Sequence, residues 1–274
     1  MSDFDRNVAA AQLGRPMTRA EAAVVDQGLR AYMLRIYNYM VLGLAITGFA
    51  ALGVYMASVT GDPAAAGRLA RGGAEVAAQI RQGVFLTPIG VALFVSPLKW
   101  AVILAPLALV FFFSFRLERM SVSAAHATFW LFAALIGLSL GSVFLVYTHT
   151  SVVRVFFITA ASFGALSLWG YTTQRELSGM GSFLIMGLFG LIIAMLVNLF
   201  LQSSAMQFVI SVIGVLVFAG LTAWDTQRLK NEYIYGALQG DIAEKSAISG
   251  ALSLYLNFIN MFTFLLHLFG QREE

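Results

Sequence analysis

The chain contains no cysteine, which excludes disulfide bonds, thiolate chemistry and cysteine-based metal sites. It also has little charge, because Asp, Glu, Lys and Arg make up only 11% of its residues, compared with about 25% in typical soluble domains. The only histidines are His126, His149 and His267, which are scattered without the spacing of a zinc site. Neither a structural metal nor a bound cofactor is expected.

Apolar residues dominate what is present: 59% of the 274 residues are hydrophobic and the mean hydropathy is +0.80. These values predict a polytopic membrane protein whose first partner is the lipid bilayer. The net charge is +3, but the few basic residues lie between apolar runs, as topology signals do. Nucleic-acid binding is therefore not expected.

Seven apolar runs are long enough to cross a bilayer, which takes about 20 residues as a helix. They are Tyr32–Ala57, Leu98–Phe115, His126–Tyr147, Val152–Tyr171, Ser182–Leu201, Met206–Trp224 and Ala247–Gly270. The linkers are mostly too short to hold a domain, so we expect an all-α helical bundle over residues 32–270.

Three segments lie outside the predicted spans. Residues 1–31 form a charged tail without the basic n-region and cleavage site of a signal peptide, and residues 271–274 form a short second tail. Residues 59–97 begin as a Gly/Ala/Pro-rich loop and become apolar, which predicts an extramembrane or re-entrant insertion with a short helix. With the N-terminus in the cytoplasm, most Lys and Arg residues fall on the cytoplasmic side, as the positive-inside rule requires. Seven spans then place the C-terminus outside.

Few polar side chains lie inside the spans, where lipid offers them no partner. Asn198 and Gln202 are four residues apart in the fifth span, and Asn257 and Asn260 are three apart in the last. Such amides commonly join helices at ~0.6 to 2 kcal/mol per contact. The alternative is that they line a pore.

Asp225 directly follows an apolar run, and placing its charge in the bilayer would cost at least ~2.5 kcal/mol. One interpretation is that it caps the sixth span and pairs with Arg228 at i, i+3. The other is that it is a gate or an ion ligand reached from a cavity.

The residues around Asp225 resemble the paired C-terminal signature of the Bax inhibitor family, the transmembrane Bax inhibitor motif proteins. The signature is carried by "AWDTQRLK" (Ala223–Lys230) and "ALSLYLNFINMF" (Ala251–Phe262). "GLSLGSVFLVYT" (Gly137–Thr148), "FFITAASFGALSLWGYTTQRELSGMGSFLIMG" (Phe156–Gly187) and "SVIGVLVFAGLTAWDTQ" (Ser211–Gln227) fit its bacterial branch.

The resemblance implies a seven-helix bundle with the last helix central, and a pH-sensitive calcium leak across a bacterial inner membrane. It places Asp225 at the first position of an aspartate pair that senses pH. It places Arg116 where an arginine would latch that pair, or Arg119 if the second helix ends a turn later. The second aspartate is replaced here by Asn257 in "LYLNFIN".

This replacement changes the expected pH response. Two carboxylates held close titrate as a coupled pair, with one apparent pKa raised toward neutral pH, and an aspartate beside an amide lacks this like-charge effect. We therefore expect opening by protonation to need a lower pH than in a two-acid relative. Carboxylate and amide oxygens suit calcium, but one acid supports only weak, transient binding at Asp225 during permeation.

Other functions fit less well. An intramembrane aspartic protease needs two carboxylates sharing a proton, and a serine protease needs a base beside its nucleophile, so no enzyme is expected. A proton-coupled transporter usually shows two related halves, which this sequence lacks. The main alternative is a scaffold that modulates membrane proteases or other membrane partners without conducting ions.

Overall fold

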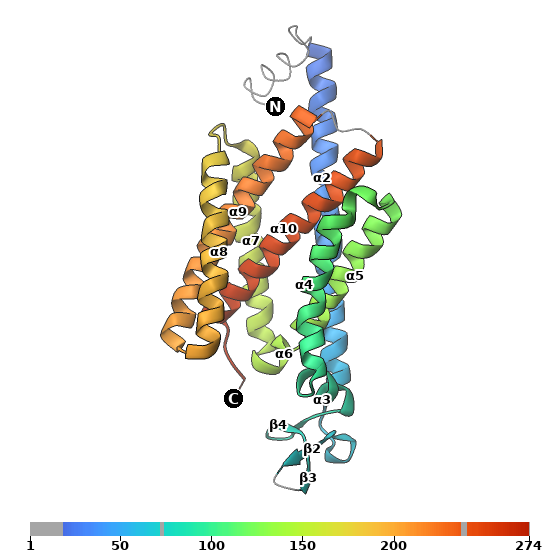
Figure 1. The fold of residues 1–274 in the computed structure, drawn as a ribbon, viewed down its shortest axis with the longest axis vertical. Helices are drawn as coiled ribbons and strands as arrows, with labels where there is room; N and C mark the ends of the chain where they lie inside the picture. Colours follow the sequence, from blue (N-terminus) through green and yellow to red (C-terminus); the bar gives the residue numbers. More distant parts are fainter. Residues whose placement is uncertain (1–18, 72–73, 237–239, 274) are drawn as a thin grey trace. The chain divides into compact units, whose positions relative to one another are not determined.

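The computed structural model describes residues 19–71, 74–236 and 240–273 (Figure 1). The chain divides into two compact units rather than one. The first comprises the described residues up to Val41 together with Val153–Gly270. The second comprises Leu42–Val152 and the tail that starts at Gln271.

The seven predicted spans are confirmed, because seven helices among the described residues are long and apolar enough to cross a membrane. The helices that supply them are α2 (Arg19–Ser58), α4 (Leu98–Arg116), α5 (Val122–Leu140) with the short α6 (Val143–Val146), α7 (His149–Thr172), α8 (Ser178–Leu201), α9 (Ser204–Gly236) and α10 (Gly240–Phe269).

The helices α2, α9 and α10 extend furthest beyond the apolar runs. The helix α9 continues past Trp224 to Gly236, and α10 begins at Gly240, before the predicted Ala247. The helix α2 begins at Arg19, inside the segment predicted as a tail, whose residues 1–18 lie outside the described part. Hydropathy marks where lipid contact ends, whereas Gln, Arg, Lys and Glu continue a helix readily.

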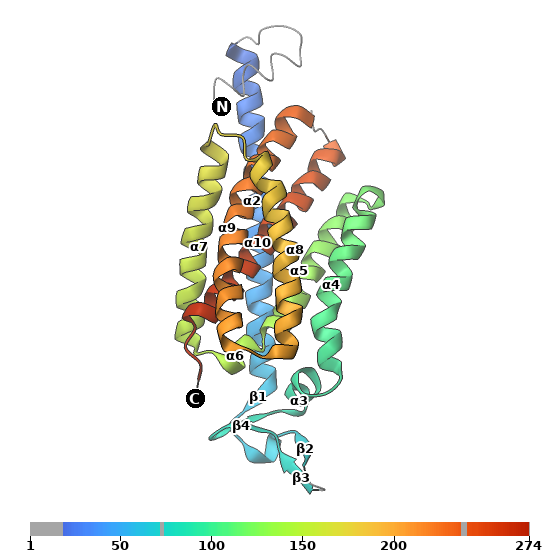
Figure 2. The ribbon, with the colours of Figure 1, turned by 60° about the vertical axis from the view of Figure 1, so that its left-hand side comes forward.

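In the first unit, α10 is the central helix, as predicted. Figures 1 and 2 both show α9 running beside α10 and α8. The ring of Phe163 on α7 lies 5.6 Å from that of Phe258 on α10. A methyl group at Gly250 of α10 would meet Leu229 of α9 and Ile36 of α2. The last helix therefore contacts three neighbours.

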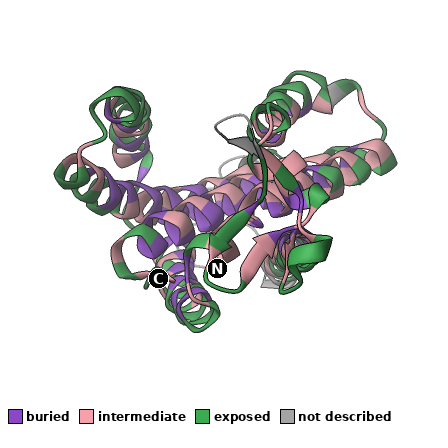
Figure 3. Ribbon diagram, turned by 90° about the horizontal axis from the view of Figure 1, so that it is seen from below, coloured by how far each residue is buried: buried purple, intermediate pink, exposed green. Residues whose placement is uncertain are grey.

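Apolar side chains divide between the helix contacts and the outer faces. Along α10, residues such as Ile248, Tyr255 and Met261 are buried. Along α8, residues such as Phe189 and Phe200 are exposed. Figure 3 colours the described residues by burial. A water-soluble helix would be polar on this outer face, so the pattern is typical of contact with lipid.

In the second unit, α5 packs closely on the later part of α2. The hydroxyl of Thr47 donates a 2.9 Å hydrogen bond to the carbonyl of Ala133. A methyl group at Gly137 would come within 2.6 Å of the Thr47 carbonyl oxygen, so only glycine allows the two backbones to lie this close.

The insertion of residues 59–97 contains β-structure that was not predicted. Its first sheet has the order β1 (Val59–Thr60), β5 (Val84–Leu86), β4 (Gln79–Arg81), and β2 (Arg68–Arg71) pairs with β3 (Ala74–Ala77). A short helix was expected, and α3 (Pro88–Phe94) provides it after a 3-10 turn at Pro63–Ala65.

A two-residue turn explains part of this β-structure. Arg81 pairs with Val84, so Gln82 and Gly83 form the turn between β4 and β5. Gly83 has a φ of 74°, which glycine adopts without strain. The turn signal was present in the sequence, but the strands beside it are too short to show a clear period of two.

Candidate functional site: the polar junction of α9 and α10

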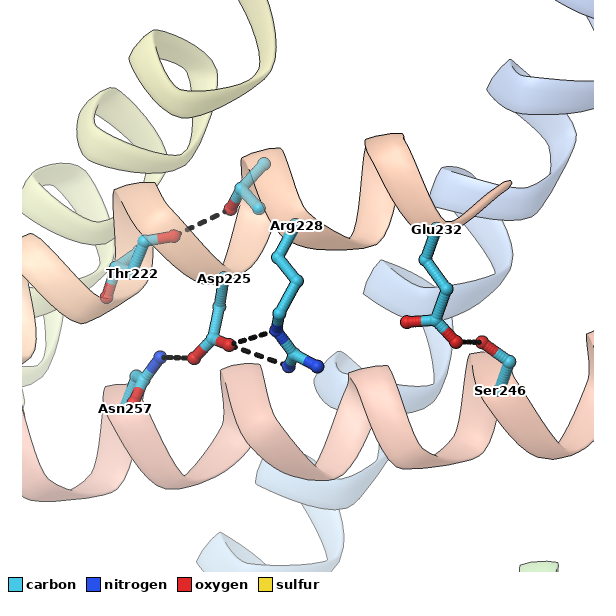
Figure 4. Close-up of polar contacts among 7 residues, drawn as sticks. Thr222, Asp225, Arg228, Glu232, Ser246 and Asn257 are labelled. Atoms are coloured by element: carbon cyan, nitrogen blue, oxygen red, sulfur yellow. Dashed lines mark hydrogen bonds and ion pairs between the residues drawn. The ribbon is translucent and has the colours of Figure 1, made fainter. Parts of the chain in front are cut away.

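Asp225 lies inside α9 rather than at its end. The helix continues through Arg228 and Lys230 to Gly236, so the interpretation of Asp225 as a helix cap is wrong. Its predicted i, i+3 pairing with Arg228 is present. The carboxylate points from α9 toward α10 (Figure 4).

Both carboxylate oxygens of Asp225 have partners. Arg228 donates two hydrogen bonds to Oδ1, of 3.0 Å from Nε and 2.7 Å from an Nη. Asn257 on α10 donates a 2.8 Å hydrogen bond from Nδ2 to Oδ2. Asp225 and Asn257 are only 6% and 5% exposed, respectively. A charged carboxylate in such a place needs these partners, because an unpaired buried charge costs several kcal/mol.

Arg228 connects this buried carboxylate to a more open environment. Its side chain is 40% exposed, and its Cζ lies 5.4 Å from the ring centroid of Trp224 on the same helix. The guanidinium group thus pairs with Asp225 on one side and contacts an aromatic ring on the other. The cation that neutralises Asp225 in the structure comes from its own helix.

The opposite side of α9 holds the loop between α7 and α8. Gln227 accepts a 2.8 Å hydrogen bond from the Leu177 amide and donates one of 2.8 Å to the Arg175 carbonyl. The buried Lys230 donates a 3.2 Å hydrogen bond to the carbonyl of Tyr171 in the last turn of α7. These contacts satisfy loop and helix-end groups that would otherwise be unpaired.

A chain of hydroxyl groups joins α2, α7 and α9 next to Asp225. Tyr37 and Ser167 are hydrogen-bonded at 2.6 Å, and Ser167 and Thr226 at 2.9 Å. Thr226 also donates to the carbonyl of Thr222 one turn earlier. Thr226, the residue after Asp225, therefore has a polar partner on another helix.

Nearer the ends of α9 and α10, Ser246 donates a 2.6 Å hydrogen bond to Glu232 and is 2.7 Å from the Tyr32 hydroxyl (Figure 4 shows the Glu232 contact). Glu244 is bound by both Arg35 and Tyr39 of α2. The polar residues of α10 thus contact both α9 and α2.

The other predicted amides lie away from Asp225. Asn198 on α8 donates to Gln207 on α9 at 3.1 Å and accepts from the Ser203 amide at 3.1 Å, so it joins two helices and their turn. Gln202 is not on the same helix face, because it caps α8 in the left-handed conformation with a φ of 49°. Asn260 donates back to the Leu256 carbonyl of its own helix.

The two arginines considered for the latch belong to the second unit. Arg116 is the last residue of α4 and Arg119 ends the following 3-10 turn, and both are exposed. Their part in a latch stays a prediction, as does transient calcium binding at Asp225. Within residues 19–71, 74–236 and 240–273, no three His, Asp or Glu side chains are grouped as a metal site would group them.

Sequence reasoning missed the roles of Gln227, Lys230, Glu232 and Glu244. The polar run after Trp224 was interpreted as the chain leaving the membrane. Residues three apart lie on the same face of a helix. If the helix is continued through this run, Asp225 and Arg228 therefore share one face, and Gln227 and Lys230 share another. That pattern is visible in the sequence, but the partners of each face are not.

Comparison with known proteins identifies the family of the chain. The family model described as "Inhibitor of apoptosis-promoting Bax1" matches residues 29–274. An uncharacterized protein of Caulobacter vibrioides is 44% identical over 276 residues, covering 100% of both chains. A protein of Rickettsia prowazekii is 42% identical, covering 94% of this chain and 96% of its own. The inner membrane protein YbhL of Escherichia coli is 41% identical, covering 90% of this chain and 94% of its own. The match to nearly the whole chain, together with the seven apolar helices and the α9–α10 junction, shows that this membrane protein belongs to the Bax inhibitor family.

Proposed function

We propose that the protein is a calcium leak channel of the inner membrane, gated by the polar contacts of Asp225. The observation that supports this proposal most directly is a buried carboxylate in an apolar helix, held by one amide from α10 and one cation from α9. Ionisable groups inside membrane helices commonly mark ion pathways.

The chemistry of the junction fits a gate. In the closed state, Asp225 accepts hydrogen bonds from Asn257 and Arg228, so neither of its oxygens is free for a passing ion. Protonation would remove the negative charge that holds Arg228 and would weaken the bond to Asn257. The α9–α10 contact would then loosen.

Calcium is the proposed ion because the groups that a loosened junction would expose are hard oxygen donors, namely the carboxylate of Asp225 and the side-chain carbonyl of Asn257. A single carboxylate gives weak binding, which suits passage rather than storage. The amide at Asn257 supplies no second negative charge, so the opening is expected at acidic pH.

The decisive experiment is calcium flux into proteoliposomes across about pH 5 to 8, from mildly acidic to mildly basic conditions. Wild type is expected to conduct, with more flux at the acid end. Asp225→Ala should remove the pH dependence. Asn257→Asp should shift the response toward neutral pH, because two close carboxylates favour sharing a proton.

Asn260→Asp is the matched control, since it adds a carboxylate to the same helix at a residue whose amide is hydrogen-bonded to the backbone of that helix. Equal pH profiles for Asn257→Asp and Asn260→Asp would contradict the gate. Flux no higher than in empty liposomes for every variant would contradict conduction and favour the scaffold function. A scaffold would tolerate Asp225→Ala and would depend on the charged residues 1–31.

We also propose a cytoplasmic N-terminus and an external C-terminus. This orientation follows from the distribution of Lys and Arg, and the inner-membrane location from the name of the relative YbhL. Because the chain has no cysteine, single substitutions Asp3→Cys and Gln271→Cys can be labelled in intact cells with an impermeant thiol reagent. Labelling of position 271 alone is expected, and labelling of position 3 alone would reverse the assignment.

A further inference from the structure

The C-terminal tail, residues 271–273, is fastened by backbone hydrogen bonds within the second unit. The Thr148 amide donates to the Gln271 carbonyl at 2.9 Å, and the Glu273 amide donates to the Val146 carbonyl at 3.0 Å. Tyr147 and Arg272 therefore face each other as an antiparallel bridge. The tail lies like a short strand along the elbow between α6 and α7.

Side chains add to this attachment. The backbone amide of Gln271 donates a 2.9 Å hydrogen bond to the side-chain hydroxyl of Ser151 in the first turn of α7. His149 has a ring nitrogen 4.0 Å from the Glu273 carboxylate, an ion pair only when the imidazole is protonated. The centroid of the His149 ring lies 5.4 Å from that of Phe144 and 5.1 Å from that of Tyr55. The elbow is thus a packed surface.

Glu273 extends the attachment to the insertion. Its carboxylate forms an ion pair with Arg81, the last residue of β4. Both side chains are largely buried, at 23% and 24% exposed, so water screens this pair less than a surface pair. A single side chain of the tail therefore contacts the insertion on one side and the elbow on the other.

We propose that residues 271–273 are a clasp that holds the insertion of residues 59–97 against the α6–α7 elbow, with Glu273 as the residue that locks it. Within the described residues of the second unit, the Arg81–Glu273 pair is a polar contact that joins the tail to the insertion. In the chain, the tail follows α10 directly. This role does not depend on ion conduction.

Cross-linking through a spacer tests the proximity that the clasp requires. In the cysteine-free chain, Arg81→Cys combined with Glu273→Cys is expected to be joined in native membranes by a short thiol-specific bifunctional reagent, because the two long side chains that meet in the ion pair leave room for a spacer where a direct disulfide needs closer backbones. The control pair is Arg68→Cys with Glu273→Cys, because Arg68 lies on β2 in the other sheet. Equal cross-linking of the two pairs, or none in the first, would overturn the proposal.

Limited proteolysis tests the locking function. Trypsin cleaves after arginine, and Arg81 lies in a paired strand of the insertion. In the purified full-length protein, Glu273→Gln is expected to raise the cleavage rate after Arg81 on the order of tenfold, since local opening controls such cleavage. A chain ending at Gly270 should be cleaved faster still.

The control is Arg272→Gln, which removes an exposed charge of the tail but keeps Glu273 and the backbone bridge. It should be cleaved after Arg81 at the wild-type rate. Wild-type rates for both Glu273→Gln and the shortened chain would overturn the clasp. Faster cleavage of Arg272→Gln to the same extent as Glu273→Gln would overturn the specific role of Glu273.

Discussion

Asn257 on α10 donates a 2.8 Å hydrogen bond to Asp225 on α9, and both side chains are buried. This bond joins the two helices at the position where the family resemblance implies a pair of acids. An amide in this place can serve only as a neutral partner. It stabilises the ionised aspartate and, unlike a second acid, adds no charge repulsion.

Asn257→Leu is expected to lower the free energy of unfolding by about 1–3 kcal/mol, because it leaves one oxygen of a buried carboxylate without a donor. The measurement is thermal or denaturant unfolding of the purified protein in detergent.

The matched control is Asn260→Leu, three residues further along α10. The Asn260 amide is hydrogen-bonded to the Leu256 carbonyl of its own helix. When this amide is removed, the Leu256 carbonyl still has its backbone partner in the helix. A smaller loss is expected here, and equal losses for the two variants would show that the contact with Asp225 contributes nothing specific.

Arg228→Met is expected to destabilise the protein by roughly 1–3 kcal/mol, the range for losing hydrogen bonds to a charged group. Partial exposure of the guanidinium keeps the loss below that of a fully buried pair.

A double-mutant cycle isolates the Arg228–Asp225 interaction. Asp225→Asn removes the charge that Arg228 neutralises, so the second substitution should cost less in this background than in wild type. Strict additivity of the two losses would mean that the pair is not coupled, despite its short contacts.

Gly170→Ala on α7 should lower the free energy of unfolding by about 1–3 kcal/mol. The added methyl group would lie 2.2 Å from the Ala223 carbonyl oxygen on α9, so the backbone of one helix must move. Gly164→Ala is the control on the same helix, since a methyl group there meets no atom within 4 Å. The control should be neutral or slightly stabilising. Comparing unfolding temperatures of the two variants checks this, and a similar drop for both would contradict the close approach of α7 and α9.

Gln227→Met is expected to loosen the loop between α7 and α8, because the Leu177 amide and the Arg175 carbonyl both lose their partner. Hydrogen exchange of the Leu177 amide should become faster by about tenfold or more, as expected for a lost protecting hydrogen bond.

Arg175→Ala provides the control for this loop. Gln227 binds the backbone carbonyl of Arg175, so removal of the exposed arginine side chain should leave exchange at Leu177 unchanged. Unchanged exchange in Gln227→Met would show that the loop is held by other contacts.

The number of spans could be predicted from hydropathy alone, because a helix that crosses the bilayer needs about 20 apolar residues whichever helices it packs against. The family signature around Asp225 and Asn257 likewise identified the helix pair that carries the site. The helix ends could not be predicted this way. Beyond its apolar run, α10 packs on α2 through the polar contacts of Ser246 and Glu244, and α9 contacts α10 through Glu232.

The sequence by itself therefore determined a seven-span membrane protein of this family with one conspicuous aspartate. That information is local, since it depends on residue type and spacing along one helix. The pair of Asp225 and Arg228 was one of two interpretations of the sequence, and the structure selected it. Only the tertiary structure decided that Gln227 and Lys230 hold the neighbouring loop. Likewise, only the folded chain brings Glu273 to Arg81. Such pairings join residues far apart in the chain, and an isolated charge or amide has many equivalent partners until packing selects one.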